Sequence, residues 1–161
     1  MTCQNKTLFV LRLAMGWLML WAFLDKTFGL GHATLAENAW LKGASPTQGF
    51  LLHATQGPLA GLFQSMAGNP LVDWLFMVGL LAVGVCFILG IGLRVAGVSG
   101  ALMMVLMWLA TLWPENNPFL DEHLIFALVF LYIPLTGTSS LCPLGKWWRS
   151  QKFVQKWTVL E

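Results

Sequence analysis

Four long apolar segments dominate the sequence, and short polar stretches separate them. The apolar segments cover about residues 8–30, 71–93, 95–113 and 119–140. A helix needs about 20 residues to cross the hydrocarbon core of a bilayer, and each segment is near that length. We therefore expect an all-α integral membrane protein, a single domain whose four transmembrane helices form an up-down bundle.

The connection between the first two segments, residues 31–70, is too long for a simple turn. Loops of this length are usually functional. Leu, Phe, Trp and Ala are common in it, and the pairs Ser45-Pro46 and Gly57-Pro58 are typical of helix starts. We expect short helices that lie on the outer membrane surface.

A second polar stretch, residues 113–126, reads WPENNPFLDEHLIF and separates the third and fourth segments. Pro114 ends the preceding helix, and Pro118 precedes the next one. Carboxylates and a histidine are concentrated here, whereas the rest of the chain carries few charges. Two interpretations stay open: an ordinary interfacial turn with solvated charges, or one wall of a polar pocket at the membrane surface.

Composition supports the membrane assignment and excludes several other classes. The chain is 57% hydrophobic and 10% charged, whereas soluble domains carry about 25% charged residues. Its net charge of +2, without a basic patch, argues against nucleic-acid binding. The three cysteines lie far apart in sequence, which excludes the usual haem, zinc and dithiol motifs. We predict no metal site.

The distribution of charge predicts the orientation. Lys6, Arg12, Arg94 and the cations of residues 141–161 fall on one side of the proposed bundle, so both termini are expected in the cytoplasm. The basic, Trp-rich segment 141–161 is interpreted as an amphipathic tail on an anionic membrane face. Its expected anchors are Lys146, Trp147, Trp148, Arg149, Lys152 and Trp157.

The up-down order brings several polar residues to the outer end of the bundle. They are Asp25 and Lys26 at the end of the first span, Asp73 at the start of the second, Glu115 after the third, and Asp121 and His123 at the start of the fourth. Charges at the border of lipid are costly unless they are paired or hydrated. Such residues are therefore candidates for function.

Lys26, Asp73, Asp121 and His123 are the candidate catalytic residues of this outer pocket. Lys26 suits an anion or a quinone oxygen, and His123 suits proton transfer near neutral pH. Asp73 or Asp121 would orient the histidine or act as a base. In the alternative interpretation, Lys26 pairs with one of these aspartates and only locks the bundle. Stacking on a quinone head is expected from Trp21, Trp74 and Trp113.

Several motifs resemble the DoxX/DoxD family of small four-helix membrane proteins. They are LRLAMG around Arg12, Asp25-Lys26-Thr27-Phe28, GIGLRVAG in residues 90–97 and NNPFLDEHLIFALV in residues 116–129. The DoxD members are known as the membrane subunit of thiosulfate:quinone oxidoreductase, which oxidises thiosulfate to tetrathionate. The resemblance implies an inner-membrane protein of a bacterium or archaeon, a quinone as cofactor and other membrane-protein subunits as partners.

Two functions compete at this point. The first is a quinone-linked oxidoreductase subunit, which requires the outer pocket. The second is a non-catalytic subunit that packs against a larger respiratory or photosynthetic complex, in which the Trp-rich and Gly-rich faces serve contact and lipid binding. A cavity beside Lys26 would favour the first.

Overall fold

The computed structural model describes residues 3–114 and 117–160, and its regular structure in these ranges is entirely helical. The four main helices are α1 (Cys3–Phe28), α4 (Pro70–Leu89), α5 (Leu93–Ala110) and α6 (Glu122–Tyr132). The all-α prediction is confirmed. Glu115 of the expected outer pocket lies outside the described residues.

Three of these helices are long and apolar enough to cross a membrane: α1 from Asn5 to Phe28, α4 and α5. They confirm a multi-pass membrane protein. The fourth segment differs from the prediction, because α6 and the following 3-10 turn η4 (Ile133–Thr136) together cover only Glu122–Thr136. Pro134 and the left-handed Gly137 end this helix well before residue 140.

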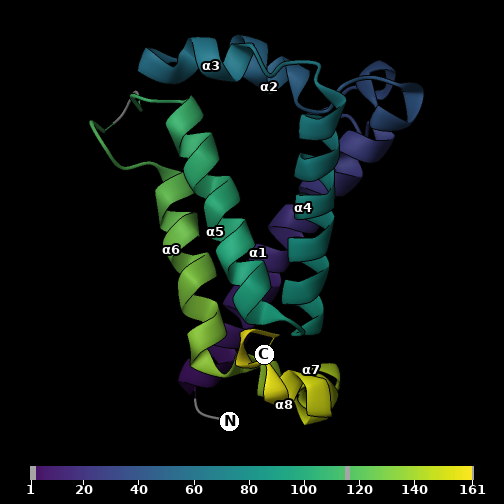
Figure 1. The fold of residues 1–161 in the computed structure, drawn as a ribbon, viewed down its shortest axis with the longest axis vertical. Helices are drawn as coiled ribbons and strands as arrows, with labels where there is room; N and C mark the ends of the chain where they lie inside the picture. Colours follow the sequence, from purple (N-terminus) through teal and green to yellow (C-terminus); the bar gives the residue numbers. More distant parts are fainter. Residues whose placement is uncertain (1–2, 115–116, 161) are drawn as a thin grey trace.

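The four main helices form two antiparallel pairs that splay apart (Figure 1). One pair is α1 with α4, and the other is α5 with α6. A short link through Gly90 and Gly92, both in the left-handed conformation, joins α4 to α5. The helices converge at this link, which we call the termini end because the start of α1 and helices α7 and α8 lie there. The opposite end is the loop end.

Glycines allow close contact between α1 and α4. A Cβ added to Gly84 would lie 2.8 Å from the backbone nitrogen of Leu20, and one added to Gly16 would lie 2.9 Å from that of Ile88. Small residues at such crossings let helix backbones approach closely in lipid.

Aromatic packing joins the two helix pairs near the termini end. Phe87 of α4 and Phe130 of α6 are both fully buried, and their ring centroids lie 5.0 Å apart in an edge-to-face arrangement. Many leucines and valines on the outer faces of the four helices are exposed instead. In a membrane protein these side chains contact lipid.

The connection between α1 and α4 folds into short helices across the loop end (Figure 1), as the sequence predicts. These helices are η1 (Ala36–Asn38), η2 (Trp40–Lys42), α2 (Gln48–His53), η3 (Gly57–Leu59) and α3 (Ala60–Gln64). The backbone N–H of Gln56 donates to the carbonyl of Ala110, a 2.9 Å contact that ties the connection to the end of α5.

The C-terminal segment lies at the termini end as η5 (Thr138–Leu141), α7 (Pro143–Ser150), α8 (Lys152–Lys156) and η6 (Thr158–Leu160). Of the predicted membrane anchors, Lys146, Trp147, Lys152 and Trp157 are exposed. Trp148 and Arg149 are half-buried and hydrogen-bonded within the protein: Nε1 of Trp148 donates to the carbonyl of Leu160, and Nη1 of Arg149 donates to Oγ of Ser140. These two side chains therefore also hold the tail in its fold.

Candidate functional site

Two buried carboxylates attach the connection to the bundle. Asp25 accepts hydrogen bonds from the backbone N–H groups of His32 and Ala33, at 3.2 and 3.0 Å. Asp73 accepts from the Ser45 hydroxyl at 2.8 Å and from both the hydroxyl and the backbone N–H of Thr47. Hydrogen bonds to a charged acceptor are stronger than neutral ones. Asp25 and Asp73 therefore have structural roles in placing the short helices.

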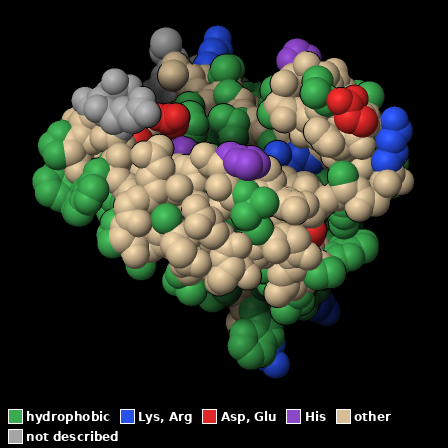
Figure 2. Space-filling view, turned by 90° about the horizontal axis from the view of Figure 1, so that it is seen from above, with side chains coloured by type: hydrophobic (Ala, Val, Ile, Leu, Met, Phe, Trp, Pro, Cys, Tyr) green, Lys and Arg blue, Asp and Glu red, His purple; other side chains and the backbone are tan. Residues whose placement is uncertain are grey.

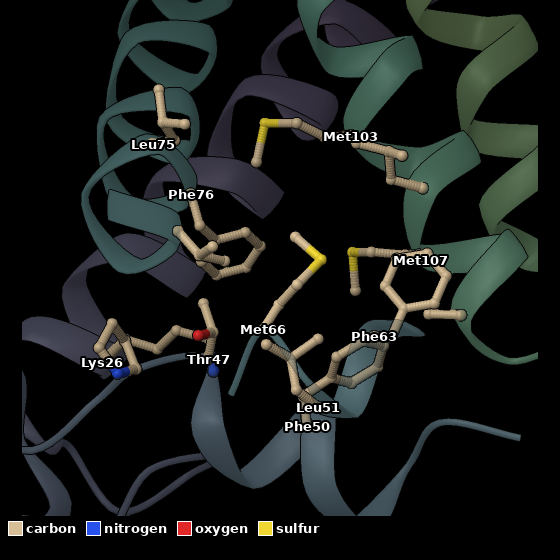
Figure 3. A pocket seen from close by; sticks show the side chains of 14 residues that line it. Lys26, Thr47, Phe50, Leu51, Phe63, Met66, Leu75, Phe76, Met103 and Met107 are labelled. Atoms are coloured by element: carbon tan, nitrogen blue, oxygen red, sulfur yellow. The ribbon is translucent and has the colours of Figure 1, made fainter. Parts of the chain in front are cut away.

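An apolar cavity of about 260 Å³ lies between α4 and α5, below the short helices α2 and α3. We call it the membrane cavity. Its lining residues are Lys26, Pro46, Thr47, Phe50, Leu51, Phe63, Met66, Val72, Leu75, Phe76, Met103, Leu106, Met107 and Ala110. In Figure 3, Lys26 and Thr47 lie at one side of the cavity, and Phe63, Met66 and Met107 lie around its middle.

The membrane cavity is open toward lipid. Leu75 of α4 is 67% exposed and Leu106 of α5 is 45% exposed, yet both also line the cavity. Its rim therefore includes side chains of the lipid-facing surface. Among the described lining residues Lys26 is the only charged one, so the cavity offers an apolar interior with a single cation at its edge.

Lys26 also lines a larger polar depression on the surface of the loop end, the loop-end hollow, of about 910 Å³. Asn38, Ser45, Gln48 and His53 contribute polar side chains to it, and its described lining contains no carboxylate. Figure 2 looks onto this end, where a Lys or Arg side chain and a His side chain meet at a depression near the middle. Lys26 thus belongs to the walls of both spaces.

Lys26 forms no ion pair with the aspartates that the sequence offers as partners. Asp73 is engaged by Ser45 and Thr47, and Asp121 is engaged by His123. In the described part of the chain, no carboxylate lies within ion-pair distance of the lysine. Locking of the bundle through Lys26 is therefore not what the structure shows.

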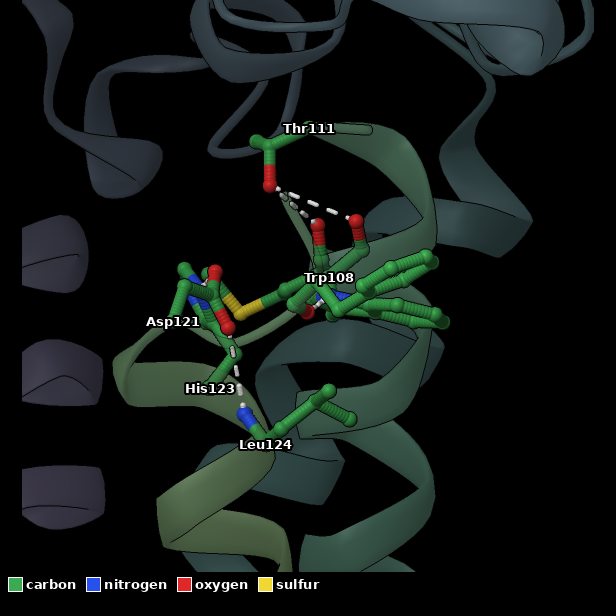
Figure 4. Close-up of polar contacts among 7 residues, drawn as sticks. Trp108, Thr111, Asp121, His123 and Leu124 are labelled. Carbon is green, nitrogen blue, oxygen red and sulfur yellow. Dashed lines mark hydrogen bonds and ion pairs between the residues drawn. The ribbon is translucent and has the colours of Figure 1, made fainter. Parts of the chain in front are cut away.

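Asp121 and His123 form a pair in a third hollow, of about 310 Å³. Oδ1 of Asp121 caps α6 by accepting from the backbone N–H of Leu124, and its Oδ2 lies 2.7 Å from Nδ1 of His123 (Figure 4). Thr111, which also lines this hollow, follows Ala110 of the membrane cavity directly in sequence. The end of α5 therefore stands between the two spaces.

The structure accordingly divides the outer pocket that the sequence predicts. Lys26 borders the membrane cavity and the loop-end hollow, whereas Asp121 and His123 line the third hollow. Asp73 lines none of these spaces. It holds Thr47, which lines the membrane cavity, and Ser45, which lines the loop-end hollow.

The three candidate tryptophans lie outside the membrane cavity. Trp21 packs against Trp17 and His32, Trp74 packs against Trp40, and Trp113 packs against Phe119. Trp113 lines the third hollow instead. Sequence reasoning missed the Met and Phe residues that do line the membrane cavity. The one available signal was the methionine cluster of residues 103–107, which is also typical of ordinary core filling.

Arg12 is fully buried at the termini end. Its Nη1 donates to the carbonyl of Thr138 at 3.1 Å, and its Nη2 lies 3.0 Å from Sγ of Cys142. Its Nε has no hydrogen-bond partner. Arg12 therefore joins α1 to the segment between α6 and α7 through neutral partners.

Comparison of the chain with protein-family models, curated proteins and solved structures finds no significant match. Among the described residues, no group of three or more His, Cys, Asp or Glu side chains is placed to hold a metal ion. Function must therefore be inferred from the cavities themselves.

Replacing Asp73 should loosen the short helices. We expect Asp73→Ala to lower the free energy of unfolding by about 3 kcal/mol, because it leaves buried donors of Thr47 without an acceptor. Thermal unfolding in detergent measures the loss, and limited proteolysis should show faster cleavage within residues 31–70. Glu37→Ala, at an exposed carboxylate of the same connection, is the control. Equal stability of the two variants would contradict the assigned role.

Proposed function

We propose that this protein is a DoxX/DoxD-like, quinone-binding membrane subunit and that the membrane cavity receives the quinone. One observation carries the proposal: an apolar cavity opens at the lipid-facing surface between α4 and α5, and Lys26 is the single charged residue among the described ones that line it. An isoprenoid quinone has matching chemistry, with an apolar tail and polar ring oxygens.

The chain's own residues supply binding and orientation. Phe63, Phe76 and Met66 provide an apolar surface that excludes water, and the ammonium of Lys26 is the donor for a ring oxygen. Thr47 places a hydroxyl in the same wall, where Asp73 holds it. When bound, a quinone accepts two electrons and two protons. The Asp121–His123 pair beyond the end of α5 is suited to hold and pass protons near this site.

The electron donor in this proposal enters from the loop-end hollow. Its polar lining contains Lys26 and no described carboxylate, which suits a small oxyanion such as thiosulfate. Oxidation of two thiosulfate ions to tetrathionate releases two electrons, the number that one quinone takes up. Lys26 borders both spaces and would therefore contact both reactants.

The fourth span and the orientation are part of the same proposal. The segment Glu122–Thr136 packs along α5 and is apolar, so it crosses most of the bilayer beside a full-length helix. The termini end carries Arg12, Arg94 and the cations of the tail and would face the cytoplasm. The loop-end hollow would then face outward.

Binding of a short-chain quinone by the purified protein in lipid nanodiscs tests the proposal. We expect saturable binding that an isoprenoid hydrocarbon of the same chain length does not match, because the hydrocarbon lacks the ring oxygens to which the lysine donates. Thiosulfate, with a soluble partner subunit added where needed, should then reduce the bound quinone. Absence of saturable binding, together with constant co-purification with a larger complex, would support the accessory-subunit alternative instead.

A further inference from the structure

A fourth space, a cleft, lies at the termini end, at the opposite end of α5 from the membrane cavity. Its volume is about 190 Å³, and it is lined by Leu93, Arg94, Pro134, Leu135, Gly137, Ser139 and Arg149. Two arginines and one serine therefore line the same small space, and the described residues that line it include no carboxylate. Three separate elements, α5, the η4–η5 segment and α7, build it.

The backbone of α5 adds to the positive character of this cleft. The helix begins at Leu93 after Gly92, which provides no side-chain cap, and its first turn contains no acidic residue. Uncapped N–H groups and the helix dipole favour an anion at such a position. Arginine recognises phosphate well because its planar guanidinium donates two parallel hydrogen bonds.

Apolar side chains continue from the cleft along the lipid-facing surface. Val98 and Leu102 follow Arg94 at four-residue spacing on α5 and are 60% and 58% exposed. Leu135, which lines the cleft, is 76% exposed, and Leu131 lies one turn before it. Two arginines thus lie at one end of an exposed apolar surface. This arrangement matches a phospholipid, which has an anionic phosphate and apolar acyl chains.

We propose that this cleft binds the phosphate of a phospholipid, whose acyl chains lie along the exposed face of α5 and α6. Arg94 and Arg149 contact the phosphate, and Ser139 supplies a hydroxyl. The site is independent of quinone binding and fixes the position of the C-terminal segment, residues 141–161. The bound lipid would link α7 to α5, and its headgroup would mark the depth of the bilayer at the termini end.

Native mass spectrometry with phosphatidylglycerol tests the site. The wild-type protein should retain one lipid, and Arg94→Gln should lower the affinity about fivefold, the usual contribution of one cation near a lipid phosphate. The double variant with Arg149→Gln should lose retention. Lys156→Gln, which removes an exposed tail cation outside the cleft, should bind like the wild type.

Two results would overturn the proposal. If Lys156→Gln weakens binding as much as Arg94→Gln does, general attraction to the basic tail holds the lipid. If an excess of inorganic phosphate displaces the lipid completely from the wild-type protein, the cleft is a site for free phosphate. Nη1 of Arg149 also donates to Oγ of Ser140, so thermal unfolding is used to check that the double variant is folded. If the C-terminal segment of the double variant unfolds, the lipid affinity of Arg94→Gln alone tests the proposal.

Discussion

Lys26→Met should weaken quinone binding by about ten- to a hundredfold, the usual value of one hydrogen bond from a charged donor. The lysine is the only charged described residue in the membrane cavity, so no neighbouring side chain can replace its ammonium. Methionine preserves the length and the apolar stem of the side chain. The fold should persist, because Lys26 forms no ion pair with any described residue, and the buried neighbouring carboxylate of Asp25 keeps its hydrogen bonds from the backbone N–H groups of His32 and Ala33.

Equilibrium titration with a short-chain quinone measures this change. Lys42→Met is the matched control, since Lys42 is an exposed cation of the connection between α1 and α4 that lines neither the membrane cavity nor the loop-end hollow. Lys42→Met should bind as the wild type does. Unchanged affinity in Lys26→Met would place the quinone oxygen elsewhere, and an equal loss in both variants would indicate a general effect of charge.

Gly84→Leu should destabilise the bundle by at least about 3 kcal/mol, at the upper end of what overpacking usually costs. A Cβ at this position would already lie 2.8 Å from the backbone of Leu20, and a backbone cannot rotate away as a side chain can. The α1–α4 pair would have to separate. Because α4 forms one wall of the membrane cavity, quinone affinity should fall as well.

Ala82→Leu is the control for this change. Ala82 lies on the same helix two residues earlier, but it is exposed at the lipid-facing surface. The larger side chain should be tolerated there, and thermal unfolding in detergent compares the two variants. Equal unfolding temperatures would show that α1 and α4 do not cross at Gly84.

The helical class and the membrane character could be predicted from the sequence, because twenty-residue apolar segments have few alternatives in water or lipid. The face of α4 that packs against α1 could not be predicted from the sequence. Ala82, Cys86 and Gly90 place small residues at four-residue spacing, a pattern typical of close helix packing, yet Ala82 is exposed and it is Gly84 that packs against α1. Several faces of an apolar helix carry small residues, and only the position of the partner helix distinguishes them.

The candidate site was predicted in part for a related reason. Topology places Lys26, Asp73 and Asp121 at the same end, but it does not determine which carboxylate bonds to which loop donor. The hydroxyl groups of Ser45 and Thr47 engage Asp73, and His123 engages Asp121, so Lys26 borders the cavity without an ion-pair partner among the described residues. Those pairings depend on the path of residues 31–70, which apolar periodicity does not encode.

Photolabelling with an azido-quinone tests the central claim most directly, since it reports where the ring lies in the native protein. Peptide mapping should find the label on the lining of the membrane cavity, at Met66, Phe76 or Met103, and an excess of unlabelled quinone should suppress it. Label that spreads over the lipid-facing leucines of α1 and α6 and resists competition would contradict the account.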